Sequence, residues 1–145
     1  MTTQNLTADD IAIVQRTWQQ VAPIADTAAG LFYDRLFATD PDLRAMFSAV
    51  DLDMQKKRLM EALSFVIGAL DNFDALVPTI AALGQRHVGY GVTPAHYFTV
   101  GSALLHTLEQ GLGDQWTDTV AAAWTNTYTA IADIMKNLGS PALAA

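Results

Sequence analysis

The spacing of apolar residues most limits what this chain can fold into, because it follows a helical period along most of the sequence. Ile11, Val14, Trp18 and Val21 recur at steps of three and four, which places them on one face of a helix. The same spacing returns in five later segments, and no stretch alternates with the period of two that predicts a β-strand. The pattern predicts an all-α domain of about seven to eight helices.

Capping and breaking residues set the expected ends of these helices. Thr7 and Asp10 suit a helix start, and Thr93 with Pro94 begins a later helix. No linker or internal repeat divides the chain, so we expect residues 1–145 to form a single domain. The expected helices run from Thr7 to Pro23, from about Ala28 to Thr39, from Pro41 to Phe47, from about Met54 to Leu70, from Asp74 to Gly89, from Pro94 past Leu108, and from about Thr117 to Leu138.

The charge and cysteine content exclude several classes of function. The chain has 15 acidic and 8 basic residues and a net charge of -7, which disfavours binding to nucleic-acid phosphates. Its one basic cluster, Lys56-Lys57-Arg58, suits a solvated helix face or a single anionic contact. The absence of cysteine excludes disulfides and thiolate metal sites. The apolar run near residues 62–70 is too short to span a membrane, and the start MTTQNLTADD is not a secretory signal, so we expect a cytoplasmic protein.

The three histidines differ in where the helical pattern places them. His106 lies half a turn away from Tyr97 and therefore faces solvent or a rim. His96 falls in the first turn of its helix, where we expect a neutral histidine that bonds to the helix start. His87 continues the inward stripe of Ile80 and Leu83. On this pattern alone, a core histidine is the more usual interpretation than a metal ligand.

Five sequence motifs, in a fixed order along the chain, indicate the protein family that this sequence resembles. They are LFYDRLF, DPDLRAMF, QKKRLM, RHVGYGVTPAHYFTVG and AAAWTNTYTAIADIM. Together they resemble the globin family, and in particular the single-domain bacterial globins related to the haem domain of flavohaemoglobins. The resemblance covers essentially the whole chain and implies a globin fold around a haem pocket.

The resemblance also implies a role for individual residues. It implies non-covalent haem b whose iron is held by His87, the proximal ligand. Tyr33, Gln55 and Leu59 would form the distal side, where the gas binds. The remaining residues that would contact the haem are Phe47, Met54, Arg58, Leu83, Val92 and Tyr97. Phe47 lies about one residue further from Gln55 than is usual in this group, so the place of Gln55 depends on the loop between them.

Two functions follow from the resemblance, and the sequence leaves both open. The first is reversible dioxygen binding for storage, transport or scavenging, with carbon monoxide and nitric oxide as further ligands. The second is nitric oxide dioxygenation, in which Tyr33 would be catalytic and a separate reductase would be needed, because no flavin- or nicotinamide-binding segment precedes Ala145. We rank a haem-based gas sensor third. Related haem domains place a glutamate where this chain has about Gly139, so we do not expect a peroxidase-like proximal side.

Overall fold

The computed structural model describes residues 6–48, 51–89 and 93–138, and these ranges contain helices and turns without strands. The all-α class is therefore confirmed. Six helices are long and the seventh, α3, is a single turn, so the number of full helices is slightly below the seven to eight expected. The helices are α1 (Ala8–Val21), α2 (Ala25–Thr39), α3 (Leu43–Met46), α4 (Leu52–Gly68), α5 (Phe73–Gly89), α6 (Pro94–Leu112) and α7 (Asp118–Leu138).

The first helix begins where its sequence predicts, and α4 does not. The amide of Asp10 donates to Thr7 Oγ1 at 3.1 Å, and the Asp10 carboxylate accepts from the Thr7 amide, which completes the expected capping box. Helix α4 begins at Leu52, two residues before the expected Met54. The cause is the Asp51 carboxylate, which accepts from the amides of Asp53 and Met54 and so caps the helix earlier.

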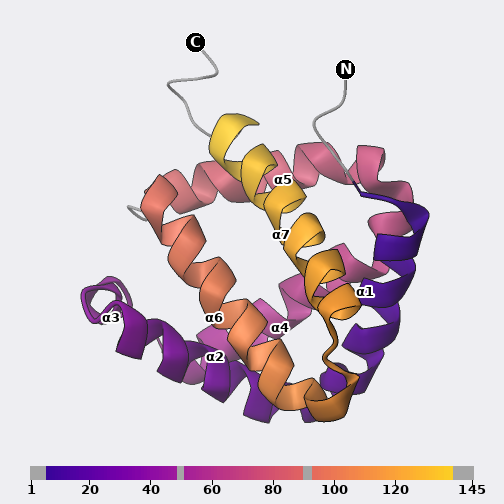
Figure 1. Ribbon diagram of the computed structural model, residues 1–145. Coiled ribbons are helices and arrows are strands. Elements are labelled where there is room, and N and C mark those ends of the chain that lie inside the picture. The colour runs from indigo at the N-terminus through magenta and orange to yellow at the C-terminus, as the bar shows by residue number, and fades with distance from the viewer. Residues whose placement is uncertain (1–5, 49–50, 90–92, 139–145) are drawn as a thin grey trace.

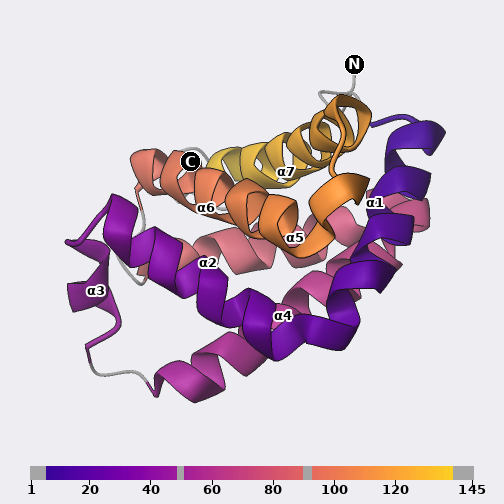
Figure 2. The same ribbon diagram turned by 60° about the horizontal axis from the view of Figure 1, so that its bottom comes forward.

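Three pairs of helices make the most extensive contacts in the fold. They are α2 with α6, α1 with α7, and α5 with α7. Figure 1 shows α6 and α7 in front of α4 and α5, with α1 beside α7. Figure 2 shows α3 at the far end of α2, away from α1 and α7. This arrangement places the end of α2, α3 and the start of α4 at one edge of the molecule.

A pair of tryptophans joins the first, fourth and last helices. The ring centroids of Trp18 and Trp124 lie 6.1 Å apart. Trp124 Nε1 donates to Thr17 Oγ1 at 2.9 Å, and Trp18 Nε1 donates to Ser64 Oγ at 3.1 Å. Because each buried indole N–H has an acceptor, these large side chains add packing without leaving an unpaired polar group.

Two glycines allow the last helix to approach its neighbours closely. A Cβ added at Gly84 of α5 would overlap the backbone of Met135 in α7, and one at Gly101 of α6 would lie 2.7 Å from the ring of Tyr128. Residues with side chains would therefore force these helices apart at both points. The lack of a side chain at Gly84 and Gly101 lets helix α7 pack closely against α5 and α6.

None of the described helices is by itself long and apolar enough to cross a membrane. The segments Leu52–Gly68 and Leu70–His87, which meet at a 59° bend, pass that test only when taken together.

Candidate functional site

The ring of His87 is oriented by its own helix. His87 is half-buried near the end of α5, and its Nδ1 lies 2.6 Å from the carbonyl oxygen of Leu83, one turn earlier. A carbonyl oxygen can only accept a hydrogen bond, so Nδ1 carries the proton and donates it. In a neutral imidazole this makes Nε2 the basic nitrogen, which is the arrangement by which a metal-binding histidine is fixed in tautomer and direction.

Tyr33 and Gln55 form a second polar group, between α2 and α4. Tyr33 is only 3% exposed, and the half-buried Gln55 side chain lies beside its hydroxyl. Burial raises the pKa of Tyr33 above its ordinary value, and hydrogen bonding with Gln55 offsets part of that shift. The phenol therefore stays protonated at neutral pH and can act as a hydrogen-bond donor. The structure thus brings together the two polar distal residues that the sequence predicts.

Aromatic side chains surround Tyr33. Its ring meets that of Phe32 edge-on at 5.0 Å between centroids and that of Phe47 at 5.7 Å, and Phe37 lies at 5.9 Å. Phe47 and Phe37 also pack edge to face at 5.7 Å. The cluster holds Tyr33 in place with apolar contacts and connects it to Phe47, which the sequence predicts as a haem contact.

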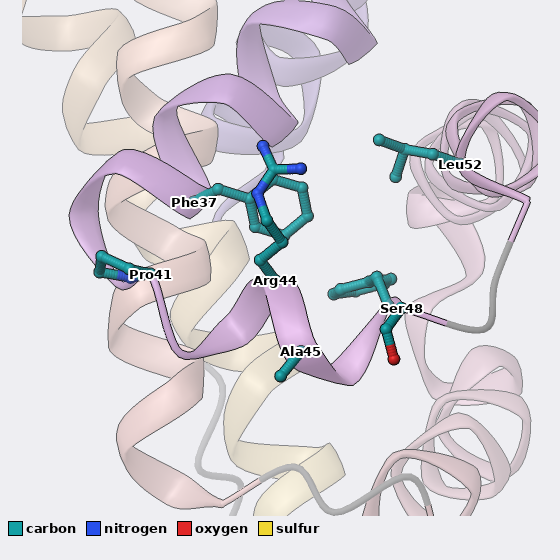
Figure 3. Close-up of a pocket in the computed structure, with 7 residues that line it drawn as sticks. Phe37, Pro41, Arg44, Ala45, Ser48 and Leu52 are labelled. Atoms are coloured by element: carbon teal, nitrogen blue, oxygen red, sulfur yellow. The ribbon is translucent and has the colours of Figure 1, made fainter.

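A hollow of about 580 Å³ opens on the other side of Phe47, between α2, α3 and the start of α4 (Figure 3). Figure 3 shows the guanidinium of Arg44 over the ring of Phe37, 4.7 Å from its centroid, with Leu52 across the hollow. Phe47 is the one predicted site residue in its lining. The lining residues are Phe37, Pro41, Arg44, Ala45, Phe47, Ser48 and Leu52.

The other predicted site residues differ in exposure. Leu59 and Leu83 are half-buried and pack against the core. Met54 is 47% exposed and Arg58 is exposed. Tyr97 is buried at the start of α6, and Val92 lies outside the described residues.

The other two histidines have surroundings distinct from those of His87. The backbone amide of Thr93 donates to His96 Nδ1 at 3.0 Å, so His96 is a capping residue, as the sequence predicts. An Nδ1 that accepts from an amide carries no proton, which makes this histidine neutral. His106 is half-buried in α6.

Sequence reasoning missed a tyrosine and a lysine of α7 that meet Tyr97. The hydroxyl of Tyr128 donates to the carbonyl oxygen of Tyr97 at 2.6 Å. Lys136 Nζ lies 6.0 Å from the Tyr97 ring centroid, and 3.7 Å from Asp133 Oδ1. The sequence carries a partial signal, since the apolar stripe of the last helix includes Tyr128 and its final turn holds Lys136. Only the packing of α7 on α6 identifies Tyr97 as their common neighbour.

These residues suit one kind of cofactor. An oriented imidazole on α5, a buried hydroxyl and amide between α2 and α4, and a nearby aromatic cluster match the needs of a haem. Haem iron in proteins of this type takes one histidine nitrogen on one face and a gas on the other. Fold and residues together define an all-α protein of a class that can hold a haem.

Comparison with known proteins agrees with this class. The model of the globin family matches residues 30–135, and the chain belongs to the globin family. It is 33% identical over 131 residues to a flavohemoprotein of Rhodopirellula baltica, covering 89% of this chain and 32% of that protein. It is 35% identical over 126 residues to the flavohemoprotein of Bacillus subtilis, covering 85% of this chain and 31% of that protein. The chain thus spans about a third of the length of these relatives.

These findings confirm the resemblance drawn from the sequence motifs. Globin membership with flavohemoprotein relatives supports the binding of haem and of gases at its iron.

Proposed function

We propose that this chain, acting as a single globin domain, binds haem b without a covalent bond and holds dioxygen reversibly. When bound, the haem supplies an iron with one position for His87 and one for a diatomic gas. Nε2 of His87 would occupy the first position, because the Nδ1 proton is directed at the Leu83 carbonyl. Phe47, Leu59, Leu83, Val92 and Tyr97 would contact the porphyrin, and Met54 and Arg58 would lie at its edge.

The buried Tyr33 hydroxyl, with the Gln55 side chain beside it, is the observation that carries this proposal. A neutral phenol in an apolar cluster is a hydrogen-bond donor that water does not compete for. Dioxygen accepts such a bond more strongly than carbon monoxide, so the pair would favour dioxygen and slow its release. Gln55 would hold the hydroxyl in the direction of the gas.

Nitric oxide dioxygenation is the alternative, and it would use the same residues. Tyr33 would then be catalytic, and electrons would come from a separate reductase. The relatives favour a reductase partner, because they are about three times as long as the matched segment and their name combines a flavin with a haem protein. Sustained consumption of nitric oxide with a reductase present would favour this alternative over dioxygen binding alone.

An absorption spectrum of the haem-reconstituted protein tests ligation by His87. We expect a Soret band that shifts when the reduced protein takes up carbon monoxide. His87→Ala should lose that band or change its position, because the proximal ligand is gone. His96→Ala is the matched control and should keep the wild-type spectrum, since His96 caps α6. A wild-type spectrum in His87→Ala would contradict the proposal.

A further inference from the structure

The last turn of α7 places a positive charge beside Tyr97. Lys136 Nζ lies 6.0 Å from the Tyr97 ring centroid, and its side chain is 33% exposed. Its acidic neighbour is Asp133, one turn earlier, at 3.7 Å and 39% exposed. At this distance and exposure, Asp133 offsets part of the charge and does not cancel it.

Packing fixes this charge on the His87 side of the molecule. The backbone of Met135, next to Lys136, meets Gly84 of α5 so closely that a Cβ there would overlap it. Gly84 follows Leu83, whose carbonyl oxygen accepts the His87 bond. The hydroxyl of Tyr128 fastens α7 to the backbone of Tyr97 at 2.6 Å. Because α7 is held to both α5 and α6 here, Lys136 belongs to the proximal end of the fold, whereas Tyr33 and Gln55 belong to the distal end.

A fixed positive charge changes the balance between two oxidation states of a nearby metal. Ferric iron has one more positive charge than ferrous iron, so a neighbouring ammonium disfavours the ferric state more. The same charge opposes donation of electron density from a histidine to the iron. Charges and hydrogen bonds around an iron centre are among the ways a protein sets its reduction potential.

We propose that Lys136 raises the reduction potential of the haem and so maintains the ferrous, gas-binding state. The proposal rests on haem ligation by His87, as put forward above. Lys136 touches neither the iron nor the gas in this scheme and acts through its charge alone. Asp133 moderates the effect because its carboxylate has the opposite sign. Removal of the charge of Lys136 and removal of the charge of Asp133 should therefore change the reduction potential of the haem in opposite directions.

The test is a reductive titration of the haem-loaded chain, followed by its visible spectrum. Lys136→Met keeps the length of the side chain and removes the charge. At a fixed potential we expect its ferrous-to-ferric ratio to fall by about threefold, which for a one-electron couple is ~28 mV. Asp133→Asn should raise the ratio, since it leaves Lys136 without its partial counter-charge. Lys136→Arg keeps the charge and should restore the wild-type value.

Several outcomes would reject the proposal. An unchanged or raised ferrous-to-ferric ratio in Lys136→Met would show that the charge of Lys136 does not raise the reduction potential. A fall of equal size in Lys136→Arg would assign the effect to packing. If Lys136→Met fails to fold, as judged by thermal unfolding, the exposed Asp133→Asn variant still decides, because a ratio that does not rise contradicts the proposal. If His87 binds the haem but the Lys136 and Asp133 variants do not behave as expected, only the proposal for Lys136 is rejected. An unchanged spectrum in His87→Ala rejects both proposals.

Discussion

The hydroxyl of Tyr33 is the atom on which dioxygen retention depends in our proposal. Tyr33→Phe removes it and keeps the ring within its aromatic cluster. A hydrogen bond to a group that accumulates negative charge contributes about 1.5–3 kcal/mol, so we expect dioxygen to dissociate roughly ten to a hundred times faster. Flash photolysis or stopped-flow mixing measures this rate, and carbon monoxide should respond much less.

Tyr128→Phe is the matched control, because it removes a hydroxyl that bonds the backbone of Tyr97 and lies outside the distal group. Its dioxygen release should stay close to the wild-type rate. An unchanged rate in Tyr33→Phe would exclude Tyr33 from gas retention. The resemblance to globins implied that Tyr33 and Gln55 lie together on the distal side. The motifs could not predict Arg44 or Lys136, whose aromatic contacts depend on how separate helices pack.

At the scale of the helices, the contact between α5 and α7 holds the last turns of α5, which carry His87, against the rest of the fold. Gly84→Ala would insert a methyl group into the backbone of Met135, and we expect the free energy of unfolding to fall by about 1–3 kcal/mol. Gly30→Ala in α2 is the control, because a Cβ there meets nothing within 4 Å. That change should raise stability by roughly 0.5–1 kcal/mol through helix propensity. Urea unfolding measures both, and equal stability of the two variants would contradict the prediction.

Helix starts were predictable where a cap lies within a few residues of its partner. Thr7 with Asp10 and Thr93 with Pro94 are such cases, since the signal is local. Helix α4 begins two residues before the start expected near Met54, because its cap, Asp51, stands in a stretch expected to be a loop with a helix start inside it. The need for glycine at position 84 was not visible in the sequence, because its cause lies 51 positions away at Met135.

At the scale of the whole molecule, three tyrosines, of which Tyr33 and Tyr97 are buried and Tyr128 is half-buried, link stability to alkaline pH. Burial raises the pKa of Tyr33, Tyr97 and Tyr128, and for Tyr128 the nearby Tyr97 raises it further. The folded state therefore favours the neutral phenols, and their contribution to stability is complete below the unfolded pKa of about 10. Stability should fall as the pH rises beyond that value, because the unfolded chain then ionises first.

Thermal unfolding midpoints between about pH 8 and 11 measure this loss. Tyr128→Phe should be less stable at neutral pH, by about 1 kcal/mol for the lost hydrogen bond, and less sensitive to alkaline pH. A midpoint that stays flat through this range would contradict the prediction. The helical class was predictable because one period runs through the sequence, whereas the burial of these phenols was not, since it requires the assembled core.

The bond between Trp124 and Thr17 joins residues 107 positions apart, and this separation has a consequence for synthesis. Helix α1 leaves the ribosome long before α7 is made, so the nascent chain must carry Trp18 without its partner Trp124 until α7 has been synthesised. The indole of Trp18 can already pair with Ser64 once α4 has emerged. Closure of this domain therefore waits until α7 has left the exit tunnel, and a cofactor that needs the closed pocket would be captured only after that point.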